Sequence, residues 1–310
     1  MPAPDATAAA RKALDRSGAG LAQLADEEPV DLDCEAGCLL LFGLACASNI
    51  AETGVQERGA WRAAAQRLAE KLTGDSASEP SAIRSEFEAG RFVTPLMAAA
   101  VSGPWGAAGR LLRSACEREW QTLDQNLLAK KNPTIFWTGA RLISFIRGEP
   151  PQPLQARWRM AIETMPPPYT IGPSLVRQIA AELAALSAYG NLPVRLSDSV
   201  GDRLGRTLPS LMFMYLKDDD LETVCLLLRA MNYLKLRAQE FADGVEFVLR
   251  HHDRDGYFAM HRVALHLNAA QSGRDIRRSV FLPLSISALW ALAECLFPTR
   301  APFAAVANHP

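Results

Sequence analysis

The sequence lacks an excess of charge of either sign. Its 310 residues carry 33 Lys and Arg against 34 Asp and Glu, so the formal net charge is −1. A protein whose main partner is nucleic acid concentrates Lys and Arg against the phosphates. The composition therefore predicts that this chain does not bind nucleic acid.

Long hydrophobic runs are also missing. The longest, residues 38–50, contains Ser48 and Asn49 and is too short to cross the roughly 30 Å hydrocarbon layer of a membrane. The first 16 residues are rich in Ala and carry charges such as Asp5 and Arg11, where a signal peptide has an apolar core. We therefore expect a cytoplasmic protein with no membrane span.

Several catalytic and cofactor-binding motifs are absent. The sequence has no Gly-x-Ser-x-Gly, no P-loop, no Gly-rich dinucleotide fingerprint and no His-Glu-x-x-His. The six cysteines include no Cys-x-x-Cys pair, which many zinc sites use, so we expect them to pack in the core as small apolar residues. The sequence predicts neither a bound metal nor a cofactor.

What the sequence does contain is helical periodicity along most of its length, in a composition that is 49% hydrophobic. The clearest segments are 61–72, 111–120, 135–146, 175–188, 208–216, 221–236, 241–249 and 282–296, with weaker ones at 6–14, 34–51, 83–88 and 92–100. This pattern predicts an all-α chain of about ten to twelve helices, arranged as an array of helical hairpins. We expect one domain over residues 1–310; the alternative is an internal boundary at the proline clusters near 149–168.

The most distinctive stretch is residues 244–260, in which an apolar helix is followed by a polar turn. Gly256 suits a backbone with positive φ, and Tyr257 and Phe258 then return to the core. This helix and its Asp-Gly-aromatic turn resemble the repeat of α/α-toroid proteins, the superfamily of the terpenoid cyclases and the protein prenyltransferase β-subunits. The resemblance covers residues 244–292 and implies an α/α toroid whose ring encloses an apolar substrate. The Asp-x-Asp-Asp signature of class II cyclases and the zinc ligands of prenyltransferases are not found.

The same region supplies the candidate site residues. A His beside a carboxylate can act in acid–base catalysis near neutral pH, so His251, Asp253 and Asp255 are the predicted catalytic residues. In a toroid this turn would bring His251 or Asp253 towards the ring mouth. Tyr257 and the basic residues Arg277 and Arg278 are the predicted substrate-binding residues; for the two arginines the alternative is a solvated loop.

A second polar turn, residues 218–220, contains three consecutive Asp residues before an apolar helix. Acidic clusters of this kind hold Mg²⁺ against diphosphates in class I terpene synthases and prenyl-diphosphate synthases. The alternative is that the carboxylates cap the N–H groups of the following helix. We expect capping.

Two functions follow from these patterns. The first is a secondary-metabolism enzyme or enzyme-like protein with a toroid cavity for a largely apolar small molecule, from a bacterial gene of the Ala- and Arg-rich kind. The second is a non-catalytic helical-repeat protein that binds a peptide or protein partner on a concave surface. A deep internal cavity favours the first, and an exposed apolar groove favours the second.

Overall fold

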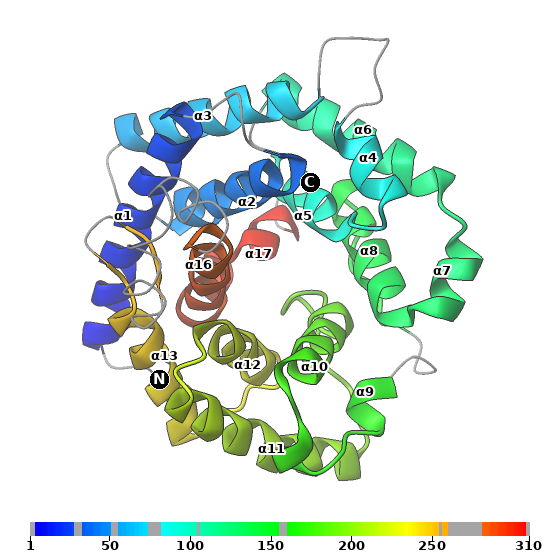
Figure 1. The fold of residues 1–310 in the computed structure, drawn as a ribbon, viewed down its shortest axis with the longest axis vertical. Coiled ribbons are helices and arrows are strands. Elements are labelled where there is room, and N and C mark those ends of the chain that lie inside the picture. Colours follow the sequence, from blue (N-terminus) through cyan, green and yellow to red (C-terminus); the bar gives the residue numbers. More distant parts are fainter. Residues whose placement is uncertain are drawn as a thin grey trace, which may run out of the picture.

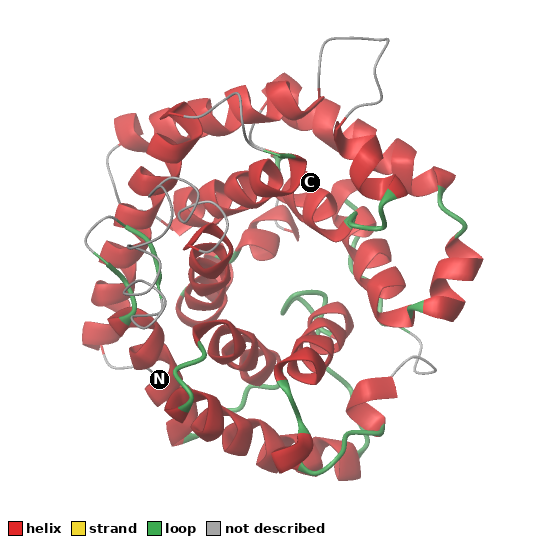
Figure 2. Cartoon of the chain, viewed as in Figure 1, coloured by secondary structure: helices red, strands yellow, loops and turns green. Residues whose placement is uncertain are grey.

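The computed structural model describes residues 4–27, 33–50, 55–73, 82–103, 106–154, 160–253, 256–259 and 281–307. The all-α prediction is confirmed: these residues form fifteen α-helices, thirteen of them at least seven residues long, and no sheet (Figure 2). Within them, the β-type pairing is one isolated bridge between His252 and Phe258.

Six helices contact one another in a closed circuit in the middle of the molecule (Figure 1). In circuit order they are α2 (Cys34–Ile50), α5 (Val93–Val101), α8 (Pro133–Ile146), α10 (Pro173–Leu186), α12 (Leu221–Tyr233) and α16 (Leu282–Leu296). Each packs against the next, and α16 returns to α2. We call them the inner helices.

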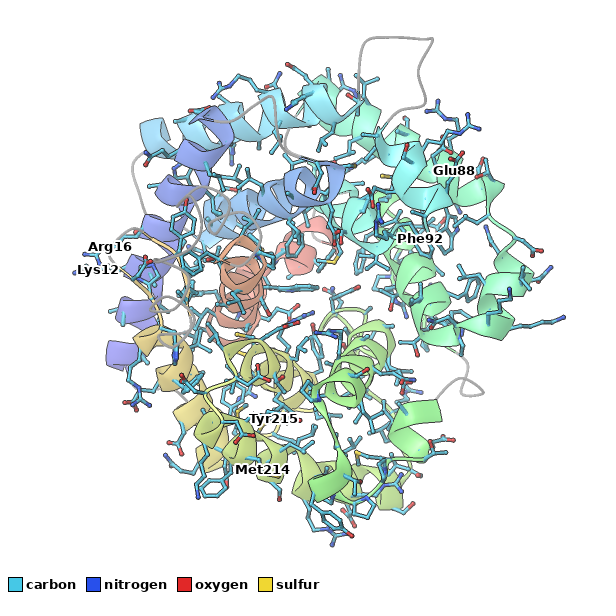
Figure 3. The ribbon with its side chains drawn as sticks, viewed as in Figure 1. Lys12, Arg16, Glu88, Phe92, Met214 and Tyr215 are labelled. Carbon is cyan, nitrogen blue, oxygen red and sulfur yellow. The ribbon has the colours of Figure 1, made fainter. Side chains whose placement is uncertain are left out.

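Eight further helices lie at the periphery of the view in Figure 1. They are α1 (Pro4–Glu27), α3 (Val55–Thr73), α4 (Ala82–Glu88), α6 (Gly106–Thr122), α7 (Gln125–Lys131), α9 (Met160–Glu163), α11 (Asp198–Lys217) and α13 (Gln239–Arg250). Helix α1 contacts both α3 and α13, and α11 contacts α13 and α9. On α1, Lys12 and Arg16 are exposed and project from its outer side (Figure 3).

Burial explains why the inner helices differ in composition from the outer ones. Helix α2 is buried on nearly every side and is apolar all round, as expected for a helix surrounded by others. Helix α13 is strongly amphipathic, with Phe241, Val245 and Val248 buried and its charged residues on the opposite face. The inner helices are the more apolar ones overall, whereas amphipathic periodicity occurs in both layers.

The short helix α17 (Pro302–Ala307) lies inside the circuit and contacts α2, α5, α8 and α16. Its Phe303 is 1% exposed. The Phe303 ring stacks on Tyr189 at 4.2 Å between centroids and lies 5.3 Å from Phe145 and 5.9 Å from Trp290. The chain thus fills the middle of its own helical circuit with an aromatic cluster.

Two further expectations concern the whole chain. All six cysteines are buried and unpaired, as expected for core residues. Among the helices in the described ranges, none has the length and apolar character needed to cross a bilayer.

Candidate functional site

The inner helices line a cavity of about 630 Å³ at their N-terminal ends, partly open to solvent, which we call the N-end cavity. Each inner helix contributes at least one lining residue from its N-terminal half. The lining residues are Asp33, Glu35, Ala36, Leu39, Val93, Thr94, Met97, Thr138, Arg177, Ala180, Ala181, Ala184, Tyr189, Glu222, Leu226, Arg229, Pro283 and Trp290.

The N-end cavity has a mostly apolar wall and several charged residues. Small side chains of α10, such as Ala180 and Ala184, leave the space open. Of the carboxylates, Asp33 accepts a hydrogen bond from the Ala36 N–H at 2.7 Å, and Glu222 pairs with Arg177 at 2.7 Å. These acidic groups lie at helix N-termini, where they offset the positive end of the helix dipole.

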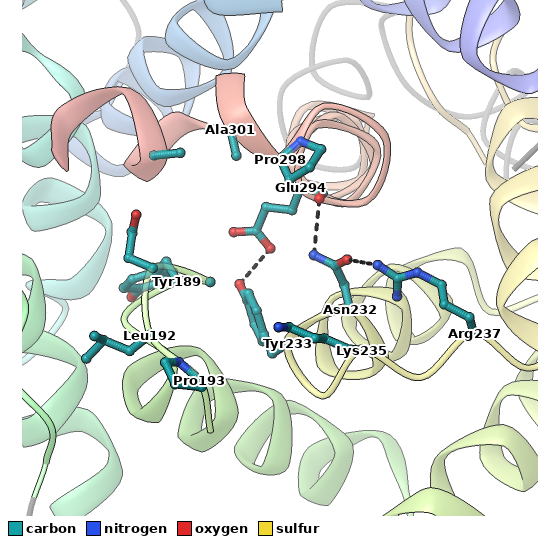
Figure 4. A pocket seen from close by; sticks show the side chains of 13 residues that line it. Tyr189, Leu192, Pro193, Asn232, Tyr233, Lys235, Arg237, Glu294, Pro298 and Ala301 are labelled. Carbon is teal, nitrogen blue, oxygen red and sulfur yellow. Dashed lines mark hydrogen bonds between the residues drawn. The ribbon is translucent and has the colours of Figure 1, made fainter. Parts of the chain in front are cut away.

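A second cavity of about 640 Å³, the C-end cavity, lies at the opposite ends of α10, α12 and α16 (Figure 4). It is lined by Tyr189, Gly190, Asn191, Leu192, Pro193, Asn232, Tyr233, Lys235, Arg237, Glu294, Pro298, Ala301 and Ala304. Many of its residues lie in or just after the last turns of helices whose N-terminal halves line the N-end cavity. The inner helices α10, α12 and α16 therefore run from one cavity to the other.

A buried cluster of polar and aromatic side chains lies between the two cavities, and we call it the partition: Tyr189, Arg229, Tyr233, Trp290 and Glu294. The Glu294 carboxylate accepts hydrogen bonds from Arg229 Nε at 3.1 Å, from the Tyr233 hydroxyl at 2.6 Å and from Trp290 Nε1 at 2.7 Å. The Arg229 guanidinium also lies 3.2 Å from the centroid of the Trp290 ring, a cation–π contact. Arg229 and Trp290 line the N-end cavity, whereas Tyr233 and Glu294 line the C-end cavity.

The electrostatics of the partition fix the charge states of its members. Burial lowers the pKa of Arg229, but the neighbouring Tyr233 and Glu294 outweigh it and raise that pKa overall, so the guanidinium stays charged. Burial raises the pKa of Tyr189, and burial together with the Glu294 carboxylate raises that of Tyr233. Both phenols therefore stay protonated near neutral pH and can donate hydrogen bonds but cannot act as bases.

Tyr189 is the residue that lines both cavities. It follows α10 in a left-handed stretch with φ of 46° at Ala188, 53° at Tyr189 and 88° at Gly190. Two consecutive non-glycine residues in this region cost roughly 1–3 kcal/mol each and persist only where the surroundings impose them. Here the strain places the Tyr189 ring against Phe303 and Trp290, in the middle of the molecule.

The predicted catalytic residues of the 251–258 turn lie elsewhere, where α13 meets α1. His251 is buried; its Nδ1 bonds the Phe247 carbonyl at 2.8 Å and its Nε2 bonds Asp219 Oδ1 at 3.0 Å. Asp253 accepts a hydrogen bond from the Tyr257 N–H at 2.8 Å. Neither residue lines the N-end or the C-end cavity. Their catalytic roles stay predictions.

Of the other predicted residues, Tyr257 is buried and donates its hydroxyl to the Gly20 carbonyl at 3.3 Å. It is close to Asp253 but lines neither of the two cavities. Asp255, Arg277 and Arg278 lie outside the described residues.

The acidic turn shows the capping that we expected. Asp220 caps α12 by accepting the Thr223 N–H at 3.0 Å. Asp219, with φ of 57°, pairs with His251. In the part of the chain that the structure describes, no three His, Cys, Asp or Glu residues are grouped as metal ligands.

We predict that Gly256→Ala destabilises the fold by more than about 1–2 kcal/mol, the cost of the left-handed conformation alone. Gly256 has φ of 89°, and a Cβ there would lie 2.5 Å from the Arg16 carbonyl oxygen. Gly90→Ala is the matched control, since Gly90 has φ of 75° and open space around its missing Cβ. Urea denaturation measures both; equal losses would contradict the proposed clash with α1.

The partition was not predicted from the sequence, although one signal for it is present. Arg229 and Glu294 are charged residues within apolar runs of α12 and α16, where an ionisable side chain needs a buried partner. Trp290 precedes Glu294 by four residues, and Arg229 precedes Tyr233 by four, so each pair shares a helix face. This spacing identifies the pairs within each helix but not the contact between the helices.

A comparison with known protein families, curated proteins and solved structures finds no significant match for the chain. The candidate site therefore rests on its geometry.

Proposed function

We propose that the chain is an α/α toroid that binds a largely apolar small molecule in the N-end cavity, as an enzyme or enzyme-like protein of secondary metabolism. The observation that carries this proposal is a cavity of about 630 Å³, partly open to solvent, that all six inner helices line. Ligand pockets of proteins usually measure about 300–1,000 Å³ and are mostly apolar with a few polar groups.

The toroid interpretation draws on the order of helix contacts. The inner helices close a circuit, and the outer helices α13, α1, α3 and α6 pack in succession around part of it. Chain order alternates between the layers at several points, for example outer α11, inner α12 and outer α13. Alternation of this kind is the connectivity of an α/α toroid.

The rival function, binding of a partner on an exposed surface, has less support. Large exposed apolar side chains of the described residues are Leu111 on α6, Leu127 on α7, Tyr169 in the 3-10 helix Pro168–Thr170 and Phe213 on α11. They lie on four different elements, and single exposed apolar residues are normal on protein surfaces.

Binding of the uncharged fluorophore 1-aminoanthracene tests the proposal. We expect saturable binding with increased fluorescence for the parent protein. Ala181 lines the N-end cavity and is partly exposed, so Ala181→Phe places a ring in the cavity. We predict that this variant binds the fluorophore at least about tenfold more weakly, a difference of about 1.4 kcal/mol.

The matched control is Ala63→Phe, which adds the same ring at an exposed position of α3. It should bind the fluorophore as the parent does, and circular dichroism should show that both variants are folded. Equal affinity of the parent and Ala181→Phe would place the binding site outside the N-end cavity, and absence of binding to the parent would overturn the proposal.

A further inference from the structure

The C-end cavity carries two positive charges that no acidic side chain of the described residues offsets. Lys235 and Arg237 line the cavity just after the end of α12, and neither forms an ion pair with a residue that the structure describes. The carboxylate that lines the same cavity, Glu294, is already paired with Arg229 at 3.1 Å. An anion in this cavity would therefore meet uncompensated positive charge.

An unusual backbone conformation positions Lys235. Its φ of 57° is left-handed, at a position after α12 where helices commonly have glycine. The Lys235 N–H donates to the Asn232 carbonyl at 3.0 Å, which fixes this conformation. The side chain is exposed, and in Figure 4 it points into the cavity on the side of Tyr233. A ligand in the cavity can therefore reach the ammonium group.

Strained backbone of this kind is concentrated at the C-end cavity. In the described ranges, the non-glycine residues with positive φ are Ala188, Tyr189, Asp219 and Lys235, and two of them, Tyr189 and Lys235, line this cavity. Asp219 binds His251 at 3.0 Å, and the Tyr189 ring packs on Phe303. Lys235 has no such partner among the described residues. Strain that the fold does not use is typical of a ligand-binding position.

Arg237 is held in place without being neutralised. Its guanidinium donates to Asn232 Oδ1 at 2.7 Å and to the Leu236 carbonyl at 3.1 Å (Figure 4). It also lies 4.4 Å from the centroid of the Phe241 ring. These uncharged partners fix the position of the guanidinium and leave its charge to act on the cavity.

The helix ends at this cavity limit how much negative charge it accepts. Helices α10, α12 and α16 end here, and the C-terminus of a helix carries a partial negative charge. This field opposes a dianion such as a phosphate more than a single carboxylate. The rest of the wall is largely apolar, with Leu192, Pro193, Pro298 and Ala301 among its residues. The cavity is thus suited to one negative charge on an apolar body.

We infer that the C-end cavity is a second binding site, which takes a small apolar monocarboxylate. The carboxylate binds the Lys235 ammonium, Arg237 adds a second positive charge, and the apolar body lies against the proline and alanine side of the wall. The inference goes beyond the proposed function, which concerns the N-end cavity.

Two probes of matched shape, the anion 2-naphthoate and the neutral 2-naphthamide, test the inference by isothermal titration calorimetry. The parent should bind the carboxylate about tenfold more tightly than the amide. Lys235→Gln should abolish this preference and leave the affinity for the amide unchanged. The matched control is Lys71→Gln, which removes an exposed cation from the last turn of α3 and should bind both probes as the parent does.

Two further variants separate binding from stabilisation of the helix end. Without ligand, Lys235→Gly should melt at or above the parent's temperature, because glycine adopts the left-handed conformation without strain, yet it should bind 2-naphthoate as weakly as Lys235→Gln. Lys235→Arg keeps the charge and should retain the preference for the carboxylate. Unchanged affinity for 2-naphthoate in Lys235→Gln and Lys235→Gly would overturn the inference.

The remaining outcomes distinguish this site from the N-end cavity. 2-Naphthoate should bind equally well when 1-aminoanthracene is present at saturation, and Ala181→Phe should bind it as the parent does. If 1-aminoanthracene displaces 2-naphthoate, or if Ala181→Phe weakens its binding, the carboxylate occupies the N-end cavity and the inference is wrong. Tighter binding of 2-naphthyl phosphate than of 2-naphthoate would also overturn it. If 1-aminoanthracene does not bind at all, the proposed function fails, and the Lys235 variants still test the second site.

Discussion

Replacing Glu294 by Ala should lower the free energy of unfolding by about 3–5 kcal/mol, because it leaves a buried charge without its partner. The Glu294 side chain is 2% exposed and that of Arg229 is 7% exposed. The substitution removes the acceptor of three hydrogen bonds, from Arg229, Tyr233 and Trp290. Water that enters this buried site cannot accept the three hydrogen bonds as well as the carboxylate does. Each donor therefore loses most of the energy of its hydrogen bond.

Urea denaturation of Glu294→Ala measures this loss, and Glu222→Ala is the matched control. Glu222 and Arg177 also form an ion pair, at 2.7 Å, but their side chains are 47% and 58% exposed. Removing that pair should cost about 1 kcal/mol or less. The double variant Arg229→Met and Glu294→Met should recover much of the stability, because it removes the buried charge itself. A loss below about 1 kcal/mol for Glu294→Ala would mean that the partition is open to solvent.

Two of the segments expected from the sequence match helices almost residue for residue. Segments expected at 83–88 and 282–296 are helices Ala82–Glu88 and Leu282–Leu296. Helix α11 was expected at 208–216 but begins ten residues earlier, at Asp198. Gly201, Gly205 and Pro209 lower the helix propensity of that region, and burial of Leu204 and Leu208 against neighbouring helices compensates for them. The local periodicity of a sequence does not show which residues will be stabilised by packing against distant helices.

Helix α7 was not predicted, because it has no buried face from which a periodic pattern could arise. It is seven residues long and has no buried residue, so it carries no apolar stripe. Its end signals are local: Asp124 caps it by accepting the Leu127 N–H at 2.9 Å, and Lys130 and Lys131 occupy its last turn. A search for caps would have found this helix where a search for periodicity did not.

The candidate site depended on contacts between distant parts of the chain. Thr138, Arg229 and Trp290 come from three different helices and Tyr189 from the turn after a fourth, and no spacing in the sequence relates them. The histidine-rich turn was the predicted site because its polar residues are adjacent in the sequence. The cavity residues become neighbours only when the inner helices close their circuit, a property of packing that local patterns do not encode.

Phe303→Ala should cost about 3–5 kcal/mol of unfolding free energy, the range for removing a fully buried aromatic ring. Phe303 is 1% exposed and lies among the rings of Phe42, Phe145, Tyr189 and Trp290, so the surrounding helices cannot collapse into the space it leaves without moving several rings. The control is Phe213→Ala on α11, where the ring is 53% exposed and the loss should be below about 1 kcal/mol.

Binding of benzene to the Phe303→Ala variant shows whether the substitution leaves a cavity or unfolds the C-terminal helix α17. If the inner helices hold their positions without the Phe303 ring, the variant contains an apolar void that benzene fills, and ligand binding to the native state raises its melting temperature. The parent, whose ring occupies that space, should respond less. If benzene stabilises the variant no more than the parent, the inner helices have closed over the void, and the Phe303 ring is not needed to keep them apart.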